Sequence, residues 1–197
     1  MTKVYRFNNL LDSELINMIR HGAVGVIPTD TVYGLVALAS DSRAIEKMYS
    51  LKRRDTQPGT IVASSVDDLV SLGFDKKQLQ KVAKYWPASL SVVLDATSIP
   101  KYLKDTRSSL AVRIPNHPTL LELLKKTGPL MTTSANMPGL QTSTSVLMAE
   151  DYFREGVDYY VDGGEINDIT PSTIIGFDEN DEMIVYREGA VRIEDLL

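Results

Sequence analysis

The sequence predicts an α/β protein with an open, twisted, mixed sheet of seven or more strands that is flanked by helices. Strand-like apolar runs alternate with helix-like segments along the whole chain, and short connectors join them. No internal repeat, low-complexity tract or long linker interrupts this alternation. At 197 residues, 43% of them hydrophobic, the chain can fill one core well, so we expect a single domain over residues 1–197.

Three helices are predicted from the spacing of apolar residues and from signals at the helix ends. Gly22 is the expected C-terminal cap of the first helix, and the second ends in a run of cations that begins with Lys52. Asp75, followed by Gln78 three positions later, is the signature of a capping box at the start of the third helix. The helices are expected over about residues 12–20, over about residues 41–54, and from residue 75 onward.

Eight segments read as strands because they are short, apolar and bounded by turn residues. They are residues 23–27, 60–63, 90–94, 110–114, 130–133, 159–161, 173–177 and 183–186. The connector between the last two, residues 179–182, is a hairpin signal. A hairpin requires an antiparallel pair, so the sheet is expected to be mixed.

Composition excludes several classes of function. The net charge of −5 argues against a protein whose main task is to coat nucleic acid, although a local basic pocket stays open. The absence of cysteine removes disulfides, thiolate catalysis and Cys-ligated zinc, and His21 and His117 lie in no metal-ligand spacing, so no metal site of the protein's own is expected. The polar N-terminus and the lack of a membrane-length apolar run predict a cytoplasmic protein.

Two segments join a strand to a run of small polar side chains. The first is Pro28 to Leu35, where an apolar strand ends in a proline that is followed by hydroxyls and a carboxylate. The second runs from Leu130 to Asn136 and repeats the order of apolar residues followed by hydroxyls and an amide. Because ligands of open α/β sheets bind at strand ends, the two segments could face one cavity. The alternative is a pair of turns in which these side chains satisfy their own backbone.

Cations are placed where an anionic ligand could meet them. The run that begins at Lys52 suits either a phosphate clamp or a solvated helix end, and both interpretations stay open. Arg113 sits inside an apolar strand, where the cost of burying an unpaired charge favours an anionic ligand over an internal salt bridge. Ser172 and Arg187 could lie at the same end of the C-terminal hairpin.

No catalytic triad, metal motif, dinucleotide-binding motif or P-loop consensus occurs in the sequence. The chemistry is therefore expected to depend on positioning and charge. Hydroxyls, an amide and several cations suit a site that holds a small zwitterion against a polyphosphate.

In their order along the chain, these segments resemble the YrdC-type family of threonylcarbamoyl-adenylate synthases, and the resemblance covers nearly the whole chain. Its markers are short motifs that are weak one by one and highly specific together. They are Pro28-Thr29-Asp30-Thr31-Val32-Tyr33-Gly34-Leu35, Lys52-x-Arg54, Trp86-Pro87, Ala111-Val112-Arg113, Ser134-Ala135-Asn136, Ser172-Thr173-Ile174-Ile175 and Arg187-x-Gly189.

The resemblance implies a single-domain YrdC-like fold and a nucleotidyl-transfer activity. The protein would condense L-threonine, bicarbonate and ATP into threonylcarbamoyl-AMP and pyrophosphate, the first step of the t6A modification of tRNA. A separate transferase would receive the product, and the protein itself would contact tRNA weakly. Mg²⁺ would accompany ATP, held largely by phosphate oxygens and water.

The resemblance also implies roles for single residues. Lys52 and Arg54 would stabilise charge on the leaving pyrophosphate, and no protein nucleophile is required. The residues expected to contact L-threonine are Thr31, Arg113, Thr132 and Ser172. The residues expected to bind ATP are Lys52, Arg54, Ser134, Asn136, Thr142 and Arg187.

Two departures from the family pattern keep an alternative open. Asp55 stands where the family has a proline after Lys-x-Arg, and residues 87–91 read Pro-Ala-Ser-Leu-Ser where the family commonly has Pro-Gly-Pro-Leu-Thr. The alternative is a family paralogue without this activity that acts as a nucleotide- or RNA-binding module. The related carbamoyl-adenylate activity of hydrogenase maturation proteins is the second option, but there the module is embedded in a much longer chain.

Overall fold

The computed structural model describes residues 2–52, 59–167 and 170–196. In this part of the chain, ten strands form one sheet. Their order across the sheet is β1-β8-β2-β3-β7-β4-β6-β5-β9-β10. The strands are β1 (Lys3–Arg6), β2 (Gly25–Pro28), β3 (Tyr33–Leu38), β4 (Thr60–Val62), β5 (Leu90–Asp95), β6 (Ser109–Arg113), β7 (Leu130–Ser134), β8 (Tyr159–Asp162), β9 (Thr173–Phe177) and β10 (Met183–Arg187). Parallel pairs (β1 with β8, β8 with β2, β4 with β6, β5 with β9) and antiparallel pairs both occur, so the mixed α/β sheet expected from the sequence is confirmed.

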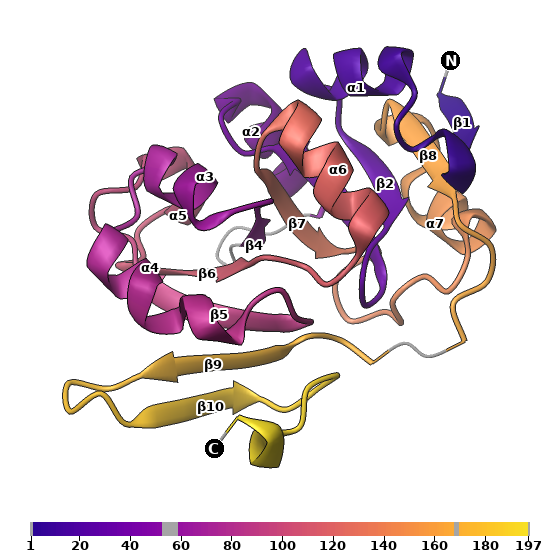
Figure 1. Ribbon diagram of the computed structural model, residues 1–197. Helices are drawn as coiled ribbons and strands as arrows, with labels where there is room; N and C mark the ends of the chain where they lie inside the picture. Colours follow the sequence, from indigo (N-terminus) through magenta and orange to yellow (C-terminus); the bar gives the residue numbers. More distant parts are fainter. Residues whose placement is uncertain (1, 53–58, 168–169, 197) are drawn as a thin grey trace.

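Helices cover both faces of this sheet (Figure 1). They are α1 (Ser13–Arg20), α2 (Ser42–Leu51), α3 (Val66–Ser71), α4 (Lys76–Val82), α5 (Lys101–Lys104), α6 (Pro118–Thr127) and α7 (Val146–Phe153). Helices α1 and α6 lie together on one face, and α2, α3, α4, α5 and α7 contribute to the core on the other. Four short 3-10 turns complete the described chain: Phe7–Asn9, Ala83–Tyr85, Arg154–Gly156 and Ile193–Asp195.

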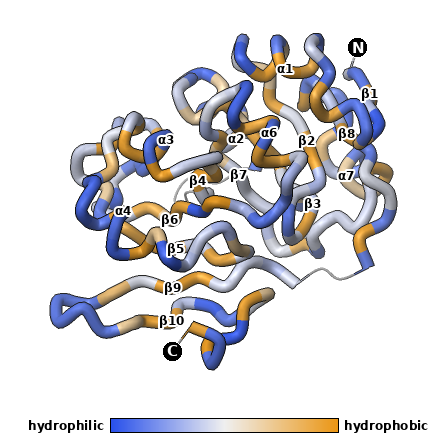
Figure 2. Tube along the Cα trace, in the orientation of Figure 1, coloured by the Kyte–Doolittle hydropathy of each residue, from blue (hydrophilic) through white to orange (hydrophobic). Residues whose placement is uncertain are grey.

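The two cores follow from the alternation of side chains along the strands. On β3, Leu35 and Ala37 face the core under α2, whereas Val36 faces the core under α1 and α6. On β2, Val26 and Ile27 divide in the same way. Figure 2 shows the result: apolar colour runs along the central strands, and polar colour gathers on the outer sides of helices and on loops.

The three predicted helices are present, with one difference at a cap. The Asp75 carboxylate accepts a hydrogen bond from the Gln78 amide at 2.9 Å, as expected of an N-cap. The Gln78 side chain does not complete the capping box, because its oxygen accepts from the backbone amide of Asp95 instead. Helices α3 and α5 are six and four residues long, too short for apolar spacing to reveal them.

The apolar strand ends at Pro28, as the sequence predicted, but the polar residues after it belong to a hairpin turn. Pro28 pairs with Tyr33 in an antiparallel hairpin, and residues 29–32 form its turn. The chain then continues as β3, a fully buried strand that the sequence reasoning did not assign. Pro28 is compatible with this place because it is the last residue of β2, where a missing amide hydrogen leaves little of the ladder unpaired.

No helix in the described part of the chain is long and apolar enough to span a membrane.

Candidate active site

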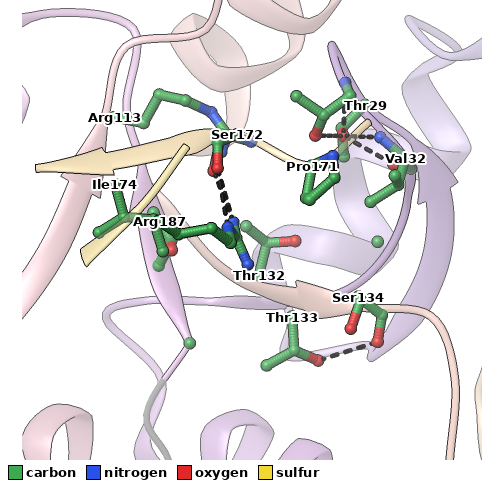
Figure 3. Close-up of a pocket in the computed structure, with 14 residues that line it drawn as sticks. Thr29, Val32, Arg113, Thr132, Thr133, Ser134, Pro171, Ser172, Ile174 and Arg187 are labelled. Carbon is green, nitrogen blue, oxygen red and sulfur yellow. Dashed lines mark hydrogen bonds between the residues drawn. The ribbon is translucent and has the colours of Figure 1, made fainter. Parts of the chain in front are cut away.

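A cavity of about 290 Å³ opens where the β2–β3 turn, the end of β7 and the C-terminal hairpin meet. Arg113, Ser172 and Arg187 gather on one side of it, opposite Thr29 and Val32 (Figure 3). The cavity is lined by Thr29, Thr31, Val32, Gly34, Gly59, Thr60, Arg113, Thr132, Thr133, Ser134, Pro171, Ser172, Ile174 and Arg187. The two polar segments singled out in the sequence therefore do face one cavity.

Within the β2–β3 turn, Thr29 and Thr31 have different tasks. The Thr29 hydroxyl donates to the Val32 carbonyl at 2.7 Å, and its oxygen lies 3.3 Å from the amides of Thr31 and Val32. Thr29 thus satisfies the turn's own backbone, which is the alternative that the sequence left open. Both threonines line the cavity, and the Thr31 hydroxyl lies 3.2 Å from the Thr29 hydroxyl.

Strand register brings the hydroxyls of β7 to the cavity. Thr132 pairs with Val36 on one side and with Thr60 on the other, and Ser134 pairs with Gly34. A Cβ atom on Gly34 would lie 2.6 Å from the Thr132 hydroxyl oxygen, which is closer than real contacts allow. Gly34 therefore leaves room for the Thr132 hydroxyl, a role that the sequence reasoning did not assign to it.

Arg113 on β6 is buried, with 4% of its side chain exposed, and it has an internal counter-ion. Its Nη2 donates to Asp30 Oδ1 at 3.0 Å, and its Nη1 donates to the Ser91 hydroxyl at 3.3 Å. The sequence argument favoured an external anion over an internal salt bridge, and the structure shows that an internal salt bridge is present. The turn places a carboxylate beside Arg113, a contact that sequence spacing alone did not show.

The ion pair with Asp30 does not use all the hydrogen-bond donors of the Arg113 guanidinium. Arginine carries five N–H groups, and Nε of Arg113 is buried without a hydrogen-bond partner in the structure. Burial lowers the pKa of Arg113 and Asp30 raises it again, but the ordinary pKa of arginine is so high that the side chain stays charged. Arg113 thus reaches the cavity wall as a cation with donors to spare.

A β-bulge brings Arg187 to the same cavity. Val185 pairs with Ile175, but Arg187 pairs with Ile174, so Tyr186 is an extra residue in β10. The shift places Arg187 on the face of Ile174, which also lines the cavity. Its Nε and Nη2 donate to the Ser172 carbonyl at 3.0 and 2.8 Å, as expected of two residues at one end of a hairpin.

The two guanidinium groups are linked through buried serines. Ser91 Oγ lies 3.1 Å from Ser172 Oγ, and Arg187 Nη2 donates to that Ser172 oxygen at 3.2 Å. Partial desolvation, and secondarily the charge of Arg113, lower the pKa of Arg187. Two cations line the cavity and Asp30 neutralises one of them, so the described wall is cationic and suits an anionic ligand.

Lys52 does not line the cavity, contrary to the idea of an exposed phosphate clamp. Its side chain is fully buried. Nζ donates to the Ser134 carbonyl at 2.8 Å, to Asn136 Oδ1 at 2.8 Å and to the Asn136 carbonyl. These bonds connect the end of α2 to the last residue of β7 and to the segment after it, and they would have to break before Lys52 could contact a phosphate.

The other residues expected to bind ATP divide in the same way. Ser134 and Arg187 line the cavity. Asn136 is turned inward, because its Oδ1 also accepts from the Ser134 hydroxyl at 2.7 Å and its Nδ2 donates to Leu140 at 2.6 Å. Thr142 is half-buried and is not part of the lining, and Arg54 and Asp55 lie outside the described residues.

Sequence reasoning missed the serines that hold this wall together. Ser89 and Ser91 are two positions apart at the start of β5, and side chains at that spacing point to the same side of a strand. Ser89 donates to Asp30 Oδ2 at 2.9 Å, and Ser91 contacts both Arg113 and Ser172. The alternation of polar residues at 89 and 91 was the available signal.

The cavity offers no ready protein site for a divalent cation. Nowhere in residues 2–52, 59–167 and 170–196 do three or more His, Asp or Glu side chains come together in a way that could hold a metal ion. Asp30, the acid next to the wall, already accepts bonds on both oxygens, from Arg113 and Ser89.

Comparison with known proteins assigns the family. The family model of Sua5, YciO and YrdC, described as "Telomere recombination", matches residues 17–189. The chain belongs to this family.

Curated and solved relatives agree with the Sua5/YciO/YrdC assignment. The chain is 33% identical to threonylcarbamoyl-AMP synthase of Pseudoalteromonas translucida over 169 residues, which cover 81% of this chain and 89% of that protein. The structure of Pyrococcus abyssi Sua5 complexed with L-threonine superposes with a TM-score of 0.84 at 26% identity, covering all of this chain and 59% of that one. Escherichia coli YciO matches over the full length of both chains with a TM-score of 0.83; at 24% identity this likeness shows the fold.

Proposed function

We propose that this protein is a threonylcarbamoyl-AMP synthase, which makes L-threonylcarbamoyladenylate and pyrophosphate from L-threonine, bicarbonate or CO₂, and ATP. The observation that carries the proposal is the cavity wall that joins Arg113 and Arg187 to a row of hydroxyls. The chain shares this family with a named threonylcarbamoyl-AMP synthase. A family structure contains L-threonine, which supports an amino-acid site in this fold.

Arg113 is the residue we assign to the carboxylate of L-threonine. It is buried at the cavity wall, it is charged, and its Nε has no partner in the structure. Hydrogen bonds between guanidinium and carboxylate are charge-assisted and directional, so they would fix the amino acid in one orientation. Hydroxyls of Thr31, Thr132 and Ser172 then provide donors and acceptors for its amino and hydroxyl groups.

Arg187 is the residue we assign to the phosphates of ATP. It lies beside Ser172, so a phosphate bound to Arg187 would stand close to an amino acid bound to Arg113. Ser134 provides a further hydroxyl on the β7 side of the cavity. This arrangement brings the two reactants together, which removes much of the entropic cost of a reaction between separate molecules.

The chemistry needs no protein nucleophile. The amine of threonine attacks the carbon of bicarbonate or CO₂, and a carbamate forms with loss of water or a proton. A carbamate oxygen then attacks the α-phosphorus of ATP, the bond from that phosphorus to the bridging oxygen breaks, and pyrophosphate leaves with the electron pair. The protein aligns the reactants and neutralises charge that moves onto the phosphates, which Mg²⁺ brought in with ATP also does.

The product is a reactive mixed anhydride, so it must be handed on quickly. We propose that a separate transferase moves the threonylcarbamoyl group to tRNA, and that this protein itself contacts tRNA only weakly. Since ATP and tRNA meet in the cytoplasm, we propose that the protein acts there.

One observation favours a second candidate, a family member that binds a nucleotide without catalysis. Lys52 donates its hydrogen bonds to protein oxygens and does not line the cavity. In this structure it is therefore not placed to stabilise charge on the phosphates of ATP. A non-catalytic protein would bind ATP and threonine without consuming either.

Pyrophosphate release separates the two candidates. Purified protein is incubated with ATP, L-threonine, bicarbonate and Mg²⁺, and with each component omitted in turn. A synthase releases pyrophosphate only when threonine and bicarbonate are both present. Release that is indifferent to threonine, or no release despite measurable ATP binding, contradicts the proposal.

A further inference from the structure

Asp30 is a buried carboxylate behind the cavity wall. Only 2% of its side chain is exposed, and it does not line the cavity. Oδ1 accepts from Arg113 Nη2 at 3.0 Å, and Oδ2 accepts from the Ser89 hydroxyl at 2.9 Å. The same hydroxyl lies 3.3 Å from the Asp30 carbonyl oxygen. Asp30 therefore connects a side chain before β5 to the cation that the cavity presents.

The contact from Ser89 fixes the side chain of Asp30 from a separate element. Thr29 orders the backbone of the turn, but its hydroxyl reaches the amides of residues 31 and 32 and not the Asp30 carboxylate. Among the described residues, Arg113 and Ser89 supply the hydrogen bonds to that carboxylate. Without Ser89, one carboxylate oxygen would lose its partner and the side chain could rotate about its χ2 bond.

The orientation of Arg113 depends on Asp30 in turn. The guanidinium is held at Nη2 by Asp30 and at Nη1 by Ser91, and the Ser91 contact is the longer of the two at 3.3 Å. A planar guanidinium recognises a carboxylate through two parallel N–H groups, so a small rotation loses one of the two bonds. The stronger restraint on that rotation is the ion pair with Asp30.

We propose that Ser89 is a positioning residue for amino-acid binding, which holds Asp30 so that Asp30 holds Arg113 in the orientation that receives the substrate carboxylate. The proposal rests on the proposed function and deepens it, because it names a residue outside the cavity lining that tunes the affinity for threonine. Ser89 touches no reacting atom. It acts on the amino-acid half of the site and leaves the nucleotide half at Arg187 unchanged.

A serine that only stabilises the fold should leave threonine binding unchanged when its hydroxyl is removed. Ser64 provides the matched case: its hydroxyl donates to an Asp68 carboxylate oxygen at 2.5 Å, at the start of α3 and away from the cavity lining. Removing either hydroxyl costs one serine–aspartate hydrogen bond. Only the Ser89 change is expected to alter binding of threonine.

The test compares Ser89→Ala, Ser89→Thr and Ser64→Ala in full-length protein. Calorimetry gives the Kd for L-threonine, and steady-state assays give kcat and the KM values for threonine and ATP. Ser89→Ala should raise the Kd and KM for threonine about three- to tenfold, the range expected for a weakened charge-assisted bond, with KM for ATP and melting temperature nearly unchanged. Ser89→Thr, which keeps the hydroxyl, should restore binding, and Ser64→Ala should match the wild type.

A double-mutant cycle tests the path through Asp30. In an Asp30→Asn background, Ser89→Ala should have little further effect on threonine binding, because the link it acts through is already changed. Additive effects, equal changes in both KM values, or an unchanged threonine Kd in Ser89→Ala overturn the inference. If the wild type binds threonine but makes no product, the proposed function fails while the Kd comparison still decides the role of Ser89; if it binds no threonine, both fail.

Discussion

Arg113 and Lys52 are both buried cations beside segments that the sequence predicted to be functional. They differ in how many of their N–H donors are used in contacts within the protein. The Lys52 ammonium, which has three N–H groups, donates to oxygens of residues 134 and 136. Arg113 gives two of its five N–H groups to Asp30 and Ser91, and it lines the cavity. Burial of a cation therefore does not by itself mark a ligand contact. Spare donors on a cation that also lines a cavity are the reason we assign Arg113, and not Lys52, to a ligand.

The largest expected effect, on both stability and threonine binding, comes from removing the Arg113 guanidinium. Arg113→Met leaves Asp30 as a buried carboxylate without its counter-ion, which costs about 3–5 kcal/mol of unfolding free energy. Threonine binding should be lost as well, because the assigned carboxylate partner is gone. Urea denaturation and calorimetry measure the two effects.

Arg192→Met is the control for this change, because it removes an arginine that is also paired with an acid. In the pair with Glu194, the Arg192 side chain is 74% exposed. This substitution should leave stability and threonine binding close to the wild type. An Arg113→Met protein that still bound threonine with unchanged affinity would refute the assignment of Arg113.

The next largest expected effect, on stability alone, comes from removing the Lys52 ammonium. Lys52→Met removes the donor to three buried oxygens and should lower the unfolding free energy by about 2–3 kcal/mol. The KM for threonine should stay the same in the protein that remains folded, because Lys52 does not line the cavity. Chemical denaturation together with steady-state kinetics gives both values.

Lys81→Met removes an exposed lysine and should change neither quantity. A Lys52→Met protein of normal stability that failed only in ATP turnover would instead support direct contact between Lys52 and phosphate.

Arg113 and Lys52 show which features of the site could be predicted from the sequence and which could not. Apolar runs and a hairpin signal predicted the mixed sheet, because these signals are local. The family resemblance implied that Thr31, Thr132 and Ser172 would meet at one ligand. Which cation ends at the cavity was not local information. It depends on a carboxylate 83 residues from Arg113 and on oxygens 82 to 84 residues from Lys52. The bulge that turns Arg187 to the cavity is likewise a property of pairing, not of composition.

A smaller effect sharpens the division of the cavity into two halves. Arg187→Gln removes a cation that is exposed overall but donates to Ser172, so the unfolding free energy should fall by only about 1 kcal/mol. The KM for ATP should rise about tenfold, the factor of a lost charge-assisted contact, while threonine affinity stays within about twofold. Parallel titrations of the two substrates check this. Equal weakening of both would mean that the cavity does not divide as we assign it.

The smallest effect concerns the space beside Thr132. Gly34→Ala would place a Cβ 2.6 Å from the Thr132 hydroxyl, so that side chain must shift, and the KM for threonine should rise about threefold. Gly176→Ala is the matched control, because its Cβ would meet Tyr186 at 2.8 Å in β9, outside the cavity lining. If the control raised the threonine KM as much, general distortion of the sheet would explain the result better than crowding at Thr132.

The most direct test of the central claim is mass spectrometry of the product formed with ¹³C-labelled bicarbonate. Wild-type protein with ATP, L-threonine and Mg²⁺ should yield threonylcarbamoyl-AMP that carries the labelled carbon between the threonine nitrogen and the AMP phosphate, with an equal amount of pyrophosphate. Formation of AMP or ADP without a labelled, threonine-containing adduct, in protein shown by calorimetry to bind both substrates, would contradict it.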